Sequence, residues 1–298
     1  MNRLSRIGLG TVQFSMDYGI SNRDGRPSES EVAAILARAV EAGVGYLDTA
    51  ASYADAETLI GRHLPSGHRL RIVTKLPPMA EDVITAAHEE TALAALAASL
   101  ERLRSPQVYG VLIHQARDLA KPGWQHLVNA LRKAKERGWT SRIGVSVYDE
   151  SDLALVESRF VPDLVQLPFN ALDRRLVASG WLARLRQSGI EVHARSLFLQ
   201  GLLLMDPAML PGFFAPIRAT LAKLRDAWAA ERDTPLSGCL RYVLGHSDID
   251  AAFVGVNRLH EFSEIEAAVA RLDGESGEFE FPAAIDPVYL DPRNWTLA

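Results

Sequence analysis

The fold is decided by one stretch, residues 71–113, which reads RIVTKLPPMAEDVITAAHEETALAALAASLERLRSPQVYGVLI. It opens with the strand-like run RIVT (71–74) and closes with VYGVLI (108–113), both rich in β-branched and aromatic residues. Between them, leucines recur at helical spacing and form one apolar face, at Leu93, Leu96, Leu100 and Leu103. A strand, a helix and a second strand predict two parallel strands joined by a crossover helix.

The same alternation runs along the whole chain. The strand-like runs are RIGLGT (6–11), GYLD (45–48), RIVT (71–74), VYGVLI (108–113), RIGVS (142–146), LVQLP (164–168), EVHARS (191–196) and AAFVG (251–255). Further helical faces are apolar at Val32, Ile35, Leu36 and Ala39, and at Ile265, Ala268, Val269 and Leu272. Eight such units with right-handed crossovers predict an α/β fold, the (β/α)₈ TIM barrel. An open doubly wound sheet is disfavoured because no GxGxxG turn follows an early strand.

Composition describes an ordinary globular protein, with 298 residues, 48% hydrophobic residues and 23% charged residues. No Pro/Ser-rich linker or charge block divides the chain, so we expect one barrel domain over residues 1–298. The tail from residue 275 to 298 ends in YLDPRNWTLA, whose apolar and aromatic content predicts packing on the barrel. The longest apolar run, near residues 197–205, is too short to span a bilayer, so no membrane partner is expected.

The chain ends and the charge suggest an intracellular setting. The start, MNRLSRIGLG, lacks the long apolar region of a signal peptide, which favours a cytoplasmic protein. Cys239 is the only cysteine, so no intrachain disulfide can form and a reducing compartment is compatible. A net charge of −5 offers no positive field for nucleic acid. We expect a monomer or a weak homo-oligomer.

Four residues with catalytic side chains lie at or just after successive strand ends. Asp48 and Tyr53 lie in YLDTAASY (46–53), Lys75 closes IVTK, and His114 closes YGVLIH. Each alone has a structural explanation, as a helix cap, a packed tyrosine, an exposed lysine or a core histidine. Barrel active sites gather at the carboxyl ends of the strands. The joint occurrence therefore predicts one shared site.

These four side chains suit hydride transfer to a carbonyl. The carbonyl oxygen needs a proton as charge develops, and a tyrosine with a pKa of about 10 can supply it if that pKa is lowered. An ammonium about 4 Å away, at an effective dielectric near 20, contributes about 4 kcal/mol, or about three pKa units. We therefore predict Tyr53 as general acid, Lys75 as its tuner, Asp48 as counter-ion of the lysine and a neutral His114 as orienting donor.

The segments DTAASY, VTK, LIH, RIGVS and LVQLPFN resemble the aldo-keto reductase family over nearly the whole chain. The segments GLGTVQFSMDYGISNRDGRPS and RSLFLQGLLL resemble more narrowly a bacterial branch linked to carbohydrate metabolism. The resemblance implies a (β/α)₈ barrel that binds an extended nicotinamide cofactor without a Rossmann motif. It also implies reduction of aldehydes and ketones or oxidation of alcohols, with the four residues above as the catalytic tetrad.

The resemblance also implies cofactor contacts. Ser146 and Gln166 match positions that hold the nicotinamide carboxamide, and Val147 replaces the asparagine that usually follows the serine. Arg195 stands where the family commonly stacks a tyrosine on the nicotinamide ring, and a guanidinium can also stack, although it could form a salt bridge instead. The expected cofactor contacts are Gly10, Thr11, Ser146, Gln166, Arg195, Ser196, Gly201, Gly255, Asn257, Arg258 and Glu261.

The phosphate end of the cofactor site departs from the family pattern. Gly255 precedes a helix whose free N–H groups suit a phosphate, and residues 196–201 form the other lip. Where relatives carry a cation near 255–257 and Gln or Arg at 261, this chain has Asn257 and Glu261, with only Arg258 nearby. The resemblance favours NADP(H) and the local residues favour NAD(H). We expect NADP(H), with NAD(H) as the alternative.

Other kinds of chemistry have little support. Of the eight histidines, the seven besides His114 form no HxH or HExxH grouping, so no metal site is expected. The partner expected from the hydride-transfer chemistry is a small carbonyl or sugar substrate. Phe14, Tyr18 and Trp295 are the candidate walls of its binding site. A catalytically slow regulatory or scaffold barrel is the alternative. The intact tetrad favours the enzyme.

Overall fold

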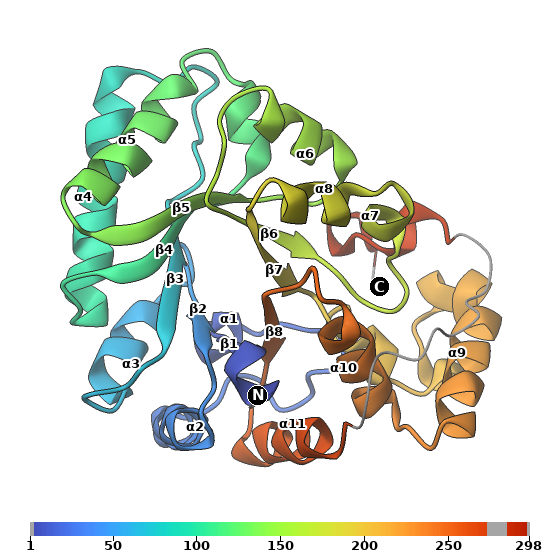
Figure 1. Cartoon of the computed structure of the whole chain (residues 1–298). Coiled ribbons are helices and arrows are strands. Elements are labelled where there is room, and N and C mark those ends of the chain that lie inside the picture. The colour runs from blue at the N-terminus through green and yellow to red at the C-terminus, as the bar shows by residue number, and fades with distance from the viewer. Residues whose placement is uncertain (1–2, 273–284, 297–298) are drawn as a thin grey trace.

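The computed structural model describes residues 3–272 and 285–296, and its centre is a closed barrel of eight parallel strands in sequential order (Figure 1). The strands are β1 (Ile7–Gly10), β2 (Tyr46–Asp48), β3 (Arg71–Lys75), β4 (Val108–Ile113), β5 (Thr140–Ser146), β6 (Leu164–Pro168), β7 (Glu191–Arg195) and β8 (Ala251–Gly255). The barrel closes where β1 pairs with β8, with Ile7 opposite Ala252. The predicted TIM barrel is confirmed, and every strand lies within two residues of its predicted bounds.

Helices surround the barrel, as Figure 1 shows. They are α1 (Val12–Ser15), α2 (Glu29–Ala42), α3 (Ala56–His63), α4 (Ala86–Leu103), α5 (Gln125–Glu136), α6 (Glu150–Glu157), α7 (Arg175–Ala178), α8 (Trp181–Gln187), α9 (Arg218–Ala230), α10 (Pro235–Gly245) and α11 (Leu259–Arg271). Short 3-10 helices are η1 (Arg3–Arg6), η2 (Ala116–Ala120), η3 (Leu202–Leu204), η4 (Pro207–Met209), η5 (Gly212–Ile217), η6 (Pro287–Tyr289) and η7 (Pro292–Asn294). None of the helices in the described ranges is long and apolar enough to cross a membrane.

Local signals set the limits of the helices. Helix α2 begins after Ser28, whose hydroxyl accepts from the backbone N–H of Glu31, and it ends at Gly43 in the left-handed conformation with φ 78°. The apolar face expected for this helix is buried against the strands, as is the leucine face of α4. Each fully buried leucine or isoleucine contributes about 1.5–3 kcal/mol to stability. The amphipathic pattern therefore positions the helices on the barrel.

A polar and aromatic cluster fills the barrel interior near the amino-terminal ends of the strands. We call Tyr46, Tyr109, Glu191 and His193 the basal cluster. The Glu191 carboxylate accepts from the hydroxyls of Tyr46 (3.0 Å) and Tyr109 (2.6 Å) and lies 2.8 Å from Nε2 of His193. The rings of Tyr46, His193 and Phe253 pack edge to face or tilted, with centroids 5.1–6.1 Å apart. Tyr46 and Glu191 are the first residues of β2 and β7 and Tyr109 is the second of β4, so the cluster fills the end of the barrel opposite the carboxyl ends of the strands.

The described part of the tail packs on the barrel. Leu290 is buried, and the Trp295 ring meets Phe214 edge to face with centroids 4.8 Å apart. The guanidinium of Arg293 lies 3.5 Å from the centre of the Tyr148 ring, just beyond β5. Within the described residues 285–296, the tail thus packs on η5 and on the segment after β5, while the rest of the predicted tail, 275–284 and 297–298, lies outside the described residues.

Candidate active site

One cavity of about 1240 Å³ opens at the carboxyl ends of the strands and is lined by all four predicted catalytic residues. Asp48 ends β2 and Lys75 ends β3, while His114 directly follows β4. Tyr53 lies on the turn between β2 and α3, where the Ser15 hydroxyl donates to its backbone carbonyl at 2.8 Å. Parallel strands therefore bring together residues that are up to 66 positions apart, from 48 to 114.

The centre of the site is a buried ion pair. The Lys75 ammonium donates to Oδ1 of Asp48 at 2.6 Å and to the carbonyl of Thr49 at 3.0 Å. Burial lowers the pKa of Lys75, and the neighbouring carboxylate opposes that shift. The Gln166 side chain donates to the same Asp48 oxygen at 2.7 Å. Asp48 is thus the counter-ion that the sequence predicts.

The environment of Tyr53 differs from the expectation in one respect. The Lys75 ammonium lies over its ring, 5.1 Å from the centroid, and the His114 ring meets it edge to face at 6.0 Å. Burial raises the pKa of Tyr53 well above its usual 10, and the Asp48 carboxylate adds to this shift. The predicted lowering is therefore not found. The charge of Arg195 lowers the pKa of Tyr53, but burial and Asp48 raise it by more.

His114 is held neutral by its surroundings. Burial lowers its pKa to about 4, and the positive charge of Lys75 acts in the same direction. Its Nδ1 lies 3.2 Å from the hydroxyl of Ser52, so one ring nitrogen has a neighbour that fixes the ring. A neutral imidazole keeps one N–H donor and one acceptor. This agrees with the predicted orienting role.

A pH titration tests the state of His114. Its ring resonances, followed by NMR, are expected to titrate near pH 4, well below the usual histidine pKa of about 6.5, because the buried ring resists protonation beside Lys75. The unfolded chain binds this proton more readily, so His114 reduces folding stability as the pH falls from about 6.5 toward 4. A midpoint between pH 6 and 7, with assignment by His114→Asn, would contradict this environment.

Most of the predicted cofactor residues line the same cavity as the four catalytic candidates. They are Gly10, Ser146, Gln166, Arg195, Ser196, Gly201, Gly255, Asn257 and Glu261. Thr11 and Arg258 do not line it. Thr11 instead holds the backbone of Asp48, since its N–H and hydroxyl both donate to that carbonyl at 3.0 and 2.9 Å. Arg258 donates to the carbonyls of Asn257 and Asp24.

The nicotinamide end of the cavity has groups that fit a carboxamide. Gln166 is fully buried, and its Oε1 has no hydrogen-bond partner among the described residues although it lines the cavity. An unsatisfied buried acceptor costs about 1–3 kcal/mol, so a ligand N–H there would relieve a real penalty. The Ser146 hydroxyl lines the same wall and can both donate and accept. These two side chains match the donors and acceptors of a carboxamide.

Arg195 has a protein partner that the sequence did not predict. Its guanidinium lies 4.2 Å from the centre of the Tyr148 ring and donates to the carbonyl of Val147 at 3.0 Å. Arg293 covers Tyr148 as well, so one phenol ring contacts two guanidinium groups. Arg195 lines the cavity, but its stacking partner in the protein is Tyr148.

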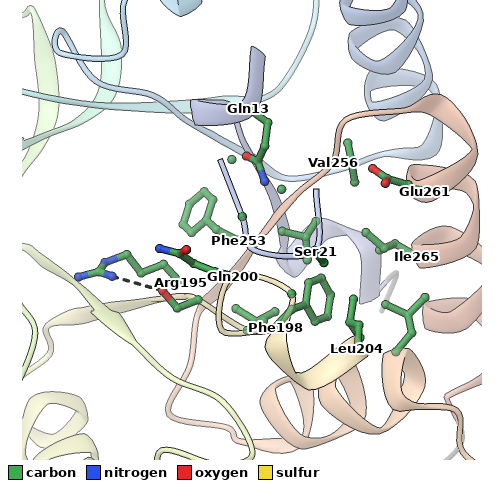
Figure 2. A pocket seen from close by; sticks show the side chains of 18 of the residues that line it. Gln13, Ser21, Arg195, Phe198, Gln200, Leu204, Phe253, Val256, Glu261 and Ile265 are labelled. Atoms are coloured by element: carbon green, nitrogen blue, oxygen red, sulfur yellow. Dashed lines mark hydrogen bonds between the residues drawn. The ribbon is translucent and has the colours of Figure 1, made fainter. Parts of the chain in front are cut away.

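Figure 2 shows further cavity residues that sequence reasoning missed, including Gln13, Ser21, Gln200 and Phe253. Gly255 makes room for one of them, since a Cβ there would lie 2.0 Å from the Gln13 side chain. Gly201 has φ +90°, and a Cβ there would meet Ser21. The glycines were visible in the sequence. The side chains that use their space are Gln13 in α1 and Ser21 in the segment between α1 and α2, and no local motif marks them.

The expected substrate walls are only partly correct. Tyr18 lines the cavity, whereas Phe14 is buried in the core and Trp295 packs against Phe214. Helical spacing explains Phe14, because α1 turns that face toward the protein interior. Within residues 3–272 and 285–296, no group of three or more His, Cys, Asp or Glu side chains could hold a metal ion.

Comparison with known proteins adds independent findings. A model of the Aldo/keto reductase family matches residues 6–276. A curated protein, methylglyoxal reductase DkgB of Escherichia coli O157:H7, is 26% identical over 232 residues, which cover 75% of this chain and 77% of that protein.

Solved structures have the same architecture. An aldo/keto reductase from Klebsiella pneumoniae in complex with NADP and acetate is 25% identical, with a TM-score of 0.65 over 91% of this chain and 88% of that chain. An aldo-keto reductase from Bacillus halodurans, in its holo form, has a TM-score of 0.72 at 21% identity, over 90% of this chain and 87% of that chain. The second likeness concerns the fold alone.

Proposed function

The chain belongs to the aldo/keto reductase family, and from this premise we propose that it is a nicotinamide-dependent oxidoreductase acting on a small aldehyde, ketone or sugar. The observation that carries the proposal is the convergence of Asp48, Tyr53, Lys75 and His114 on one cavity. When bound, the reduced nicotinamide supplies the hydride. The four side chains supply the proton and the charge stabilisation.

Each of the four residues has a distinct role in this proposal. The Tyr53 hydroxyl donates a proton to the carbonyl oxygen as negative charge develops there. The neutral His114 ring donates a hydrogen bond that orients the same oxygen. The Lys75 ammonium stabilises the phenolate left on Tyr53, and Asp48 at 2.6 Å keeps the buried lysine charged. A loss of any one charge would leave its partner buried alone.

The raised pKa of Tyr53 keeps the proton on its phenol. At neutral pH the phenol carries its proton, which is the form that a general acid needs. Alcohol oxidation would need the phenolate form, which burial and Asp48 disfavour.

Relatives support a cofactor and a substrate class. The Klebsiella pneumoniae relative was solved with NADP, and the Escherichia coli relative is named for reduction of methylglyoxal. We therefore propose a nicotinamide dinucleotide, NADP(H) or NAD(H), as cofactor and small carbonyl compounds as substrates, with a sugar aldehyde as the larger candidate. Tyr18, Gln115 and Ser52 at the cavity mouth offer polar groups for a hydroxylated substrate.

A single-turnover experiment tests the function against the scaffold alternative. The protein is loaded with NADPH and mixed with methylglyoxal, and nicotinamide absorbance is followed by stopped flow. If the protein is an enzyme, the bound cofactor should be completely oxidised within seconds at millimolar aldehyde, because enzymes commonly turn over at about 1 s⁻¹ or faster. Binding without oxidation across aldehydes, ketones and aldoses would favour the regulatory or scaffold barrel.

A further inference from the structure

The far end of the cavity, at the start of α11, is occupied by carboxylates. Oε2 of Glu261 accepts from the backbone N–H groups of Asn257 (2.6 Å) and Arg258 (3.2 Å). The next N–H, that of Leu259, donates to Oε1 of Glu31, which reaches over from α2. The N–H groups of Arg258 and Leu259, at the N-cap and first position of α11, and that of Asn257 just before them are therefore already paired with carboxylates.

The cation expected at this end is committed elsewhere. Arg258 does not line the cavity, and its guanidinium donates to the backbone carbonyls of Asn257 and Asp24. Arg271 lines the cavity but lies ten residues beyond Glu261 on the same helix, or about 15 Å along its axis. Arg225 donates to the carbonyls of Leu204 and Met205. Arg232 and Arg241 also line the cavity, from the segment between α9 and α10 and from α10, and Arg241 pairs with Asp233 at 2.7 Å. A phosphate beside Glu261 would thus meet a carboxylate there, while Arg258 is engaged with backbone carbonyls.

Glu261 belongs to the same cavity as the catalytic residues. Figure 2 shows Glu261 and Ile265 on one side of it, with Arg195 on the other. At the opposite end, the buried Oε1 of Gln166, which no described residue contacts by a hydrogen bond, indicates a ligand with a free N–H. A dinucleotide whose nicotinamide amide binds near Gln166 would extend its adenosine toward Glu261. A carboxylate has about four lone-pair positions, so Glu261 can still accept from ribose hydroxyls.

Building on the proposed function, we infer that Glu261, supported by Glu31, removes the advantage of a 2′-phosphate, so that the protein binds NAD(H) at least as tightly as NADP(H). The physical basis is simple. The ribose 2′-hydroxyl of NAD(H) can donate to the carboxylate, whereas the 2′-phosphate of NADP(H) is repelled by it and finds the N–H groups of Asn257, Arg258 and Leu259 already paired. Specificity here comes from a repulsive element rather than from a new attraction.

Cofactor binding measures this directly, without turnover. NADH and NADPH are titrated into the wild type and Glu261→Gln, with nicotinamide fluorescence and calorimetry as readouts. We expect a wild-type Kd for NADPH equal to or above that for NADH. The glutamine keeps an oxygen acceptor for the helix but removes the charge, so Glu261→Gln should tighten NADPH binding about tenfold and change NADH binding less than about twofold.

A matched control separates local from general charge effects. Glu266→Gln removes the same charge from α11, at a residue that pairs with Arg38 and does not line the cavity. It should leave the NADPH-to-NADH ratio unchanged. The inference would be overturned, and the proposed function left standing, if the wild type bound NADPH ten times more tightly than NADH. The same holds if Glu261→Gln and the control had equal ratios of the NADPH Kd to the NADH Kd. A failure of both cofactors to bind would overturn the proposed function with it.

Discussion

Tyr53→Phe is expected to lower kcat for carbonyl reduction by about 10²–10⁴-fold, the range found when a positioned general acid is lost. The substitution removes only the hydroxyl, while the ring still packs beside Lys75 and His114. Cofactor affinity should stay within about twofold, because the cofactor contacts proposed above lie on other residues. Stopped-flow reduction of an aldehyde and fluorescence titration of the cofactor measure the two effects separately.

A second tyrosine provides the control for this substitution. Tyr289→Phe also removes one phenol hydroxyl, but it lies in η6, where its ring packs on Phe213 away from the catalytic residues. Its kcat should equal that of the wild type. If Tyr53→Phe kept full turnover with normal cofactor binding, Tyr53 would not be the proton donor, and the proposed roles of Lys75 and Asp48 would fall with it.

Glu191→Ala is expected to destabilise the barrel by about 3–5 kcal/mol, the cost of removing one partner from a buried charged network. Its carboxylate accepts from two tyrosine hydroxyls and contacts His193, which is fully buried. Those donors would lose their partner in the low-dielectric barrel interior. The midpoint of urea unfolding, followed by tryptophan fluorescence, measures the loss.

The stability that Glu191 contributes should also depend on pH. Burial alone would raise its pKa, but the hydrogen bond and charge of His193, with the hydroxyls of Tyr109 and Tyr46, lower it from 4.5 to about 2. A carboxyl with a lowered pKa in the folded state stabilises the fold above about pH 4.5, and this contribution is lost as the pH falls toward 2. Glu191→Ala should therefore lose the part of the acid dependence that lies between these values.

An exposed glutamate sets the baseline for that measurement. Glu157 pairs with Arg184, and both side chains are about half exposed. Glu157→Ala should change stability by no more than about 0.5–1 kcal/mol, because surface ion pairs contribute little. Equal effects of the two substitutions would show that the basal cluster does not stabilise the barrel.

Much of the molecule could be predicted from the sequence because its signals are periodic or lie at strand ends. Alternating strands and helices fix the barrel, and the barrel brings strand ends together, so Asp48 and Lys75 could be paired before any coordinates were known. Burial of the leucine face of α4 follows from helical spacing in the same way. Predictions of this kind succeed because they need only the sequence within a few positions of each residue.

The remaining features depend on contacts between distant loops. Arg195 stacks on Tyr148, and Arg258 turns toward Asp24, because of side chains that the local sequence does not reveal. The pKa of Tyr53 was predicted in the wrong direction because the sequence gives the neighbouring charge but not the degree of burial. The contact between Glu31 and the N–H of Leu259 at the start of α11 is a similar case, since Glu31 lies in α2, more than 200 positions away in the sequence.

The aromatic layer formed by Tyr46, His193 and Phe253 affects how Tyr53 regains its proton between turnovers. These side chains are at most 6% exposed and close the barrel from below. We therefore expect the Tyr53 phenol to exchange its proton with bulk water through the open end of the cavity, which substrate and product also use. Reprotonation of Tyr53 must wait until that passage is clear, so the solvent isotope effect on steady-state turnover should report departure of the alcohol as well as chemistry.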